Sequence, residues 1–173
     1  MFKFIKLIIV IFLLMLSACK GYDMKTVEKV DIDRFMGDWY VIGIIPNFIE
    51  KYAINGIESY ELLDDDRVKI DYRFTDSRNG QVKHMQPKGW IYNKETNSEW
   101  RVQFLWPLKF PYLIIDLAED YSYTVIGVPN KKFVWIMSRE PEIAEEQYSA
   151  IIANLKTVGY DIDKIVKMPQ KWE

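Results

Sequence analysis

Few residues of this chain stand at spacings that could support catalysis or metal binding. The single histidine, His84, has no second His or Cys at the spacing of a metal site. The run Asp64-Asp65-Asp66 is more typical of an acidic turn than of a metal site, and neither a glycine-rich phosphate loop nor a nucleophile elbow occurs. Because these side chains do not converge on a reaction, we expect no catalytic residue, no metal, no cofactor and no enzyme activity.

The one cysteine, Cys19, carries the clearest chemical signal. It follows Leu16-Ser17-Ala18, and these four residues resemble the bacterial lipobox, in which the cysteine is diacylated and then acylated again at its freed amine. Several acyl chains, at roughly 0.8 kcal/mol per buried methylene, hold a protein stably on a membrane. We therefore predict that Cys19 is the lipid anchor, as an N-palmitoyl and S-diacylglycerol cysteine.

The residues before Cys19 have the pattern of a secretory signal. Lys3 and Lys6 precede an apolar run over 7–16, and a run of about ten residues is too short for the roughly 20 that a membrane-spanning helix needs. We predict a cleaved signal peptide over 1–18, a lipidated tether over 19–30 and one domain over 31–173. Loss of the two leader lysines moves the formal net charge from −2 to −4, so nucleic acid is not expected as a partner.

The rest of the chain alternates strand patterns with turn signals, and 15% of its residues are aromatic. A short helical turn capped by Asp31 is expected first, and one amphipathic helix that opens at Pro141 and closes at Gly159 is expected last. The fold class is therefore all-β, an eight-stranded antiparallel up-and-down barrel with one C-terminal α-helix packed outside. The expected strands cover 39–45, 57–63, 68–75, 82–92, 99–105, 113–117, 123–128 and 133–138.

Two motifs about 100 residues apart resemble the lipocalin family. Gly37-Asp38-Trp39-Tyr40 is similar to the opening Gly-x-Trp motif, and 133–139 resembles the last barrel strand with its closing Arg139. The resemblance is strongest to bacterial outer-membrane lipocalins and the related apolipoprotein D, although 117–121 departs from the usual Thr-Asp-Tyr motif. It implies that Gly37, Trp39 and Arg139 are structural, with the arginine packed across the tryptophan at the barrel base.

Alternation along each strand, aligned to the family register, predicts which side chains face the interior. On the first strand, Trp39 facing inward places Val41, Gly43 and Ile45 inward as well. The predicted ligand-binding residues are mostly apolar or aromatic. They are Glu58, Tyr60, Ile70, Tyr72, Phe74, Val102, Phe104, Tyr112, Ile126, Phe133 and Trp135.

Glu58 is the exception in this lining, because a carboxylate that faces a low-dielectric interior is costly unless it is paired or neutral. One hypothesis is that Glu58 disfavours anionic fatty acids and favours lysophospholipid headgroups. The alternative is a solvated charge at the rim or a bulge that turns the side chain outward. Two loops at the same end, 46–49 and 105–112, carry large apolar residues, which suggests contact with lipid, ligand or another subunit, or a lid packed on the barrel.

The resemblance implies a lipid-anchored outer-membrane protein that holds a fatty acid, lysophospholipid or similar apolar ligand for storage, transport or envelope maintenance. Lys20 after the cysteine fits outer-membrane sorting, since the inner-membrane retention signal usually places Asp there. Two other readings stay open: a structural or protein-binding lipoprotein whose barrel is filled, and a lipid-modifying enzyme. The sequence also leaves open whether the barrel forms a homodimer.

Overall fold

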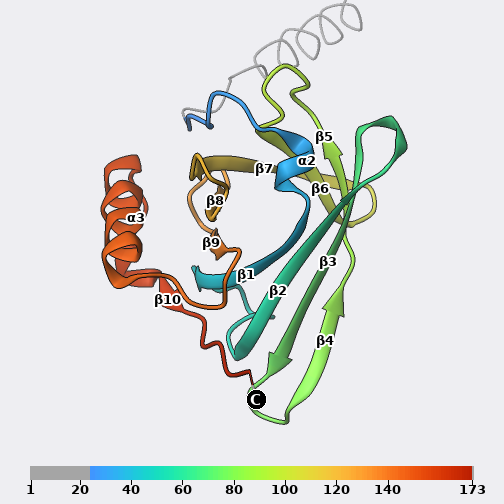
Figure 1. Ribbon diagram of the computed structural model, residues 1–173. Helices are drawn as coiled ribbons and strands as arrows, with labels where there is room; N and C mark the ends of the chain where they lie inside the picture. Colours follow the sequence, from blue (N-terminus) through green and yellow to red (C-terminus); the bar gives the residue numbers. More distant parts are fainter. Residues whose placement is uncertain (1–23, 173) are drawn as a thin grey trace, which may run out of the picture.

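The described chain, residues 24–172 of a computed structural model (Figure 1), begins with an extended segment that leads into the short helix α2 (Ile32–Phe35). The Asp31 carboxylate accepts hydrogen bonds from the backbone N–H groups of Asp33 and Arg34, at 3.2 and 3.3 Å. This N-cap satisfies donors that the first turn of a helix leaves free. The predicted helical turn is therefore present, and the predicted signal peptide and Cys19 lie outside the described residues.

The strands form one antiparallel sheet that closes because β1 pairs with both β2 and β9 (Figure 1). Since β4 and β5 together make one wall strand, the predicted barrel of eight antiparallel strands is confirmed. The strands are β1 (Gly37–Ile44), β2 (Ala53–Leu62), β3 (Arg67–Asp76), β4 (Gln81–Met85), β5 (Lys88–Ile91), β6 (Glu99–Leu105), β7 (Leu108–Leu117), β8 (Tyr123–Gly127), β9 (Val134–Ser138) and β10 (Val166–Lys167), with 3₁₀ turns η1 (Asp64–Asp66) and η2 (Ile162–Lys164).

The strand predicted over 82–92 is interrupted at Gln86-Pro87, which separates β4 from β5. Proline has no N–H to donate, so it breaks a strand ladder. β5 pairs with β3 and β6, whereas β4 pairs with β3 alone among the described strands. Beyond Gln103, β6 therefore has no pairing with β5 or β4 in the described sheet.

On the other side of the mouth, the C-terminal segment completes the wall where β1 and β2 separate. β10 pairs with the second half of β1, and the Met168 N–H donates to the Ile42 carbonyl at 2.8 Å. The Asn55 N–H of β2 donates to the Pro169 carbonyl at 2.9 Å. Residues 166–171 therefore bridge β1 and β2, and Met168 packs into the barrel core.

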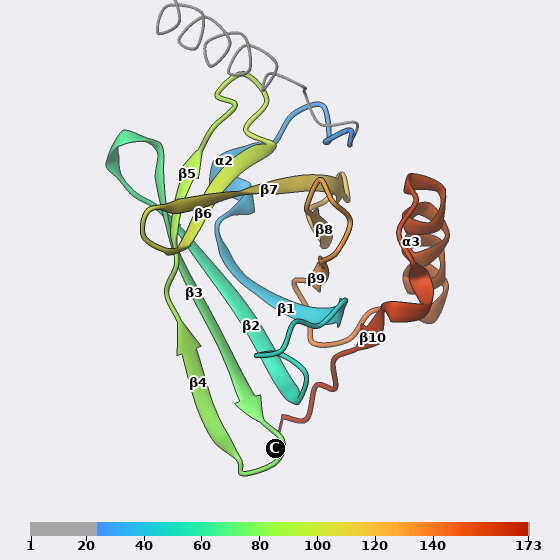
Figure 2. The ribbon, with the colours of Figure 1, turned by 180° about the vertical axis from the view of Figure 1, so that it is seen from behind.

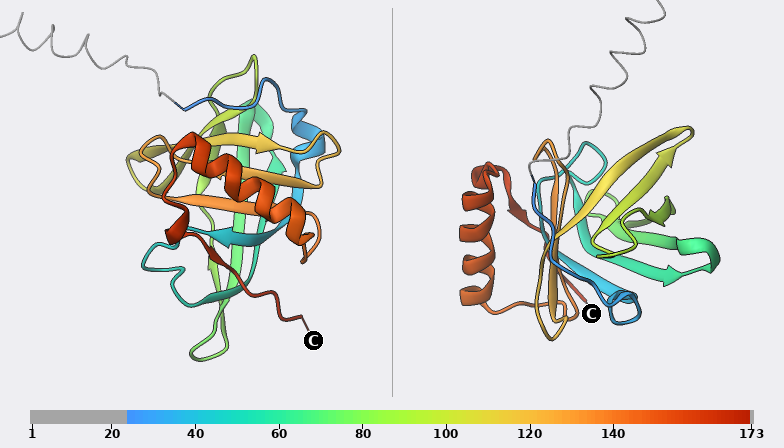
Figure 3. Two further views of the ribbon diagram at one scale, coloured as in Figure 1. Left: turned by 90° about the vertical axis from the view of Figure 1, so that its left-hand side faces the viewer. Right: turned by 90° about the horizontal axis from the view of Figure 1, so that it is seen from above.

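The helix α3 (Glu145–Val158) covers the outer face of β7, β8, β9 and β1 (Figures 2 and 3). It begins at Glu145, not at Pro141 as predicted, and residues 141–144 form an irregular segment that leads into it. Gly159 ends it in the left-handed conformation, with φ 93°, as the sequence indicated. Ile151 and Leu155 pack on this face in a second core, separate from the interior core.

Candidate functional site

The closed end of the barrel is built from the Gly-x-Trp motif and Arg139. The Arg139 guanidinium lies 3.7 Å from the Trp39 ring centroid and donates to the carbonyls of Asp38 and Arg34, at 2.8 and 2.7 Å. The Trp39 indole N–H donates to the Phe35 carbonyl at 2.8 Å. This is the packing that the resemblance implied, and it places Trp39 and Arg139 in barrel closure.

Above this base, five aromatic rings fill the lower barrel: Phe35, Trp39, Tyr60, Trp100 and Tyr112. Phe35 contacts three of the other rings, with centroids 5.2 to 5.6 Å apart. The Tyr60 and Tyr112 hydroxyls hydrogen-bond to each other across the barrel. A ligand therefore cannot reach the base without displacing packed aromatics, so any binding site lies above this layer.

Of the eleven predicted lining residues, most do face the interior. Eight are buried, Phe133 and Trp135 are half-buried near the mouth, and Phe104 is 55% exposed. Contrary to the prediction, Phe104 does not lie in the enclosed interior but is exposed where the pairing between β6 and β7 shifts register after Val102. The eight buried residues are Glu58, Tyr60, Ile70, Tyr72, Phe74, Val102, Tyr112 and Ile126.

The first strand departs from simple alternation in the same way. A register shift in the β1–β9 pairing lies between Val41 and Gly43, so Ile44 faces the interior core and Ile45 the outer core beneath α3. A Cβ on Gly43 would lie 2.9 Å from the Tyr148 hydroxyl of α3. Gly43 and Ile45 therefore face outward, because one extra residue in a strand reverses every position after it.

Glu58 does face the interior, so it is not a solvated rim charge. It is 7% exposed and lies opposite Trp39 on β1 and Tyr72 on β3. Burial raises the pKa of its carboxyl to about 8, which hydrogen bonds from Tyr60 and Tyr112 oppose and the charge of Glu50 reinforces. A buried carboxyl without a cation is neutral over much of the physiological range.

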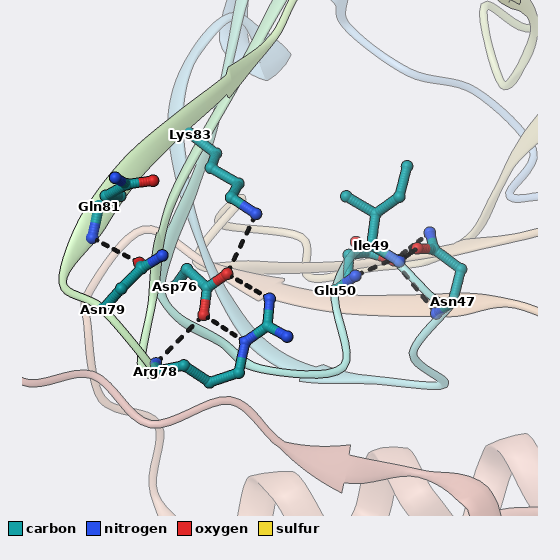
Figure 4. Close-up of polar contacts among 8 residues, drawn as sticks. All are labelled: Asn47, Ile49, Glu50, Asp76, Arg78, Asn79, Gln81 and Lys83. Atoms are coloured by element: carbon teal, nitrogen blue, oxygen red, sulfur yellow. Dashed lines mark hydrogen bonds and ion pairs between the residues drawn. The ribbon is translucent and has the colours of Figure 1, made fainter.

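Glu50 is a second interior acid that the sequence analysis missed. It belongs to the loop between β1 and β2, where the Asn47 side chain accepts from the N–H groups of Ile49 and Glu50 and donates to Glu50 (Figure 4). One Glu50 oxygen accepts from the Trp135 indole N–H at 2.9 Å. Burial raises the pKa of Glu50, and the bond from Trp135 is the main opposing effect. The Asn47 turn was the only signal that could have indicated this fold-back.

Asp76, also buried, shows the contrasting arrangement at the β3–β4 turn (Figure 4). Its oxygens accept from Arg78 at 2.7 Å and from Lys83 at 3.0 Å, and these hydrogen bonds, chiefly that of Arg78, hold its pKa well below the usual range. Glu50 and Glu58 have no such ion pair among the described residues. Paired acids stay charged, whereas these two become neutral or need a cation from outside.

The mouth combines a small pocket with exposed apolar side chains. The pocket, of about 190 Å³, is lined by Glu50, Ala53, Met168 and neighbouring residues. This is below the 300 to 1,000 Å³ typical of small-molecule sites, so the pocket alone does not hold a lipid. Phe48, Trp106 and Phe110 are 90%, 81% and 46% exposed on the loops around the mouth. Large apolar groups clustered on loops favour a lipid or protein contact.

The remaining polar candidates do not assemble into a centre. His84 is exposed and lies 3.5 Å from Asp71, and Asp66 of the acidic turn pairs with Lys94. Within residues 24–172 no group of three or more His, Cys, Asp or Glu side chains could hold a metal ion. No helix in that range is both long and apolar enough to cross a membrane.

Residues 30–170 match the family model of the lipocalin-like domain, and the chain belongs to this family. It is 23% identical over 160 residues to outer membrane lipoprotein Blc of Vibrio cholerae, covering 91% of this chain and 94% of that one. It is 27% identical over 157 residues to temperature-induced lipocalin-1 of Arabidopsis thaliana (86% and 83%), and 27% identical over 152 residues to mouse apolipoprotein D (83% and 78%).

The fold is shared with solved structures at low sequence identity. Insecticyanin from the tobacco hornworm Manduca sexta superposes with a TM-score of 0.66 and 21% identity, covering 87% of this chain and 85% of the other. Lobster apocrustacyanin A1 gives a TM-score of 0.65 at 19% identity, covering 82% and 81%. The family and the fold point to binding of a small hydrophobic ligand, and the site in this chain would surround it with aromatic walls and two acids.

Proposed function

We propose that the protein is an outer-membrane lipoprotein that binds one lipid, such as a fatty acid or lysophospholipid, in its barrel without a catalytic step. One observation carries the lipid-binding role. The interior contains polar groups that a sealed core does not need: the Glu50 and Glu58 carboxyls, and a Tyr72 hydroxyl that makes no hydrogen bond of full geometry among the described residues. A ligand with an apolar tail and a polar head would satisfy both the walls and these groups. Binding of a lipid in the barrel is compatible with storage, with transport and with envelope maintenance.

The buried lining leaves little free space inside the barrel, which fits the alternative of a filled barrel that binds another protein. Three features favour lipid entry. Met85 and Met168 pack against the interior core, and methionine side chains adapt readily to new neighbours. Phe133 and Trp135 are incompletely buried near the mouth, and the exposed apolar loops lie beyond them.

The start of the described chain bears on where the proposed anchor would hold the protein. Met24, the first described residue, contacts Tyr160, whose hydroxyl accepts from the Val128 N–H in the turn after β8. That turn lies beside the β1–β2 loop, since the Ile45 N–H donates to the Val134 carbonyl, whereas α2 precedes the opposite end of β1. Five residues span at most about 17 Å, so an acylated Cys19 would hold the mouth near the bilayer. The names of the Blc relatives support the outer membrane as the location.

Mass spectrometry of protein extracted from its own membranes tests the proposed function. We expect the denatured protein to have the mass of a chain that begins at Cys19 and carries acyl groups. Under native conditions we expect an additional noncovalent lipid of defined mass, lost on denaturation. Acylated protein without any bound lipid would instead support the filled, protein-binding barrel, and an unacylated Cys19 would overturn the anchor.

The exposed mouth loops are expected to transfer the ligand between bilayer and barrel. Replacing Trp106 and Phe110 together by Ser should slow uptake of a fluorescent lipid from vesicles about tenfold, because two large apolar groups no longer reach the bilayer. Uptake is followed by the change in fluorescence on transfer. The control is Tyr92→Ser, which removes an aromatic that is 61% exposed at the opposite end. Equal uptake rates in all three proteins would exclude this role.

A further inference from the structure

The polar groups inside the barrel form an interior acidic site, defined by Glu50, Glu58 and Tyr72 with the Tyr60–Tyr112 pair beneath. Glu50 reaches it from the β1–β2 loop, Glu58 from β2 and Tyr72 from β3. The titratable groups that face Glu58 are Glu50 and the tyrosines, and all of them are acidic. No Lys or Arg is buried in residues 24–172, so the chain supplies no cation there.

Tyr72 gives independent evidence that this site is incomplete. Its side chain is only 4% exposed, and its hydroxyl makes no hydrogen bond of full geometry in the described part of the chain, with the Glu50 carboxyl as the polar group that interacts with it. It stands directly opposite Glu58 in the β2–β3 register, and after burial the charges of Glu50 and Glu58 and the interaction with the Glu50 carboxyl raise its pKa. A buried hydroxyl without a well-formed hydrogen bond is costly, so a ligand that hydrogen-bonds to it gains affinity.

We propose that the interior acidic site binds the primary ammonium end of a single-chain lipid, inserted head first, and excludes the carboxylate of a fatty acid. The proposal rests on the proposed lipid-binding function and specifies its ligand. An ammonium group carries three donors and a positive charge, which match the two carboxyls and the Tyr72 hydroxyl. Once Glu50 and Glu58 are ionised, a carboxylate would add a third negative group to the same low-dielectric space.

The position of the site in the barrel gives the orientation of the ligand. Glu58 lies opposite Trp39, just above the aromatic base, whereas Phe74, Phe133 and Trp135 line the path toward the mouth. The alkyl chain therefore runs upward along these rings to the exposed loops. This orientation buries the charged head among its partners and leaves the tail end next to the bilayer.

This pairing predicts a characteristic pH dependence. An ammonium ion pairs with ionised Glu58, and with a pKa of about 8 roughly one tenth of Glu58 is ionised at pH 7 and nine tenths at pH 9. An alkylamine stays protonated over this range, because amines of the lysine type titrate near 10.4. The apparent affinity for the amine should rise about tenfold from pH 7 to pH 9.

The experiment compares dodecylamine, dodecanol and dodecanoate by quenching of tryptophan fluorescence at pH 7 and pH 9. We expect the tenfold gain for dodecylamine alone, in the native protein and in Glu61→Gln, whose side chain is exposed on the same strand. Glu58→Gln should abolish the gain while still binding dodecanol. A flat amine profile, or dodecanoate bound more tightly than dodecylamine at pH 9, overturns the proposal. If none of the three ligands binds, the lipid-binding function fails as well.

Free amines and phospholipid headgroups share this ammonium chemistry, and a matched pair of lysolipids separates them. Lysophosphatidylethanolamine and lysophosphatidylglycerol of the same acyl chain differ in the terminal amine. Tighter binding of the ethanolamine lipid, lost in Glu58→Gln, supports a headgroup ligand. If the two lysolipids bind equally while dodecylamine still binds more tightly at pH 9 than at pH 7, the result supports a free long-chain amine as the ligand.

Discussion

Replacing Glu58 by Gln is expected to stabilise the protein by about 3–5 kcal/mol at pH 8 while leaving its stability near pH 4.5 almost unchanged. Burial raises the folded pKa to about 8, whereas the unfolded carboxyl titrates near 4.5. Between these values the folded state binds the additional proton, so rising pH favours unfolding by about 1.4 kcal/mol per pH unit. Glutamine carries no titratable proton and removes this term.

Urea unfolding at pH 5, 6.5 and 8 measures the difference. The free energies of unfolding of the native protein and Glu58→Gln should diverge steadily as the pH rises, with the variant the more stable. Glu61→Gln, on the same strand with an exposed side chain, should follow the native protein at every pH. Parallel curves for native protein and Glu58→Gln would show that the Glu58 carboxyl is ionised inside the folded barrel.

Trp39→Ala is expected to lower the free energy of unfolding by about 3–5 kcal/mol, since the ring is fully buried and its loss leaves a cavity at the barrel base. The variant also loses the cation–π contact with Arg139 and the hydrogen bond to the Phe35 carbonyl. At roughly 2–4 °C per kcal/mol for a chain of this size, the melting temperature should fall by roughly 10 °C.

Thermal unfolding followed by circular dichroism checks this expectation. Trp106→Ala is the matched control, because that side chain is 81% exposed and its removal creates no cavity. Its melting temperature should stay within about 1 °C of the native value. A Trp39→Ala protein that kept its melting temperature but no longer bound lipid would move Trp39 from barrel closure to ligand recognition.

The sequence predicted the structure best at positions where a single residue type serves a specific structural role. Trp39 and Arg139 were matched by their motifs, and the structure brings them together at 3.7 Å although 100 positions separate them. Gly159 was recognised as a helix end because glycine adopts a positive φ without strain. These features depend on local chemistry, so the residues themselves indicate them.

Prediction failed where pairing between strands decides the outcome. The shift after Val41 turned Gly43 and Ile45 outward, and the shift after Val102 left Phe104 exposed. Nothing in the alternation of residues marks either shift. Glu50 was missed for a related reason: a loop carboxylate is normally solvated, and only the fold brings Trp135 within hydrogen-bond distance of it.

The C-terminal bridge between β1 and β2 also has a consequence for how the protein folds. β1, near the start of the domain, is flanked by β9 and β10, so the wall is completed by contacts between residues more than 90 positions apart. Such long-range pairings slow folding, because a large loop must close before they form. The β1 strand therefore lacks two of its three partner strands until β9 and β10 have been synthesised, so the wall on this side of the barrel forms late in folding.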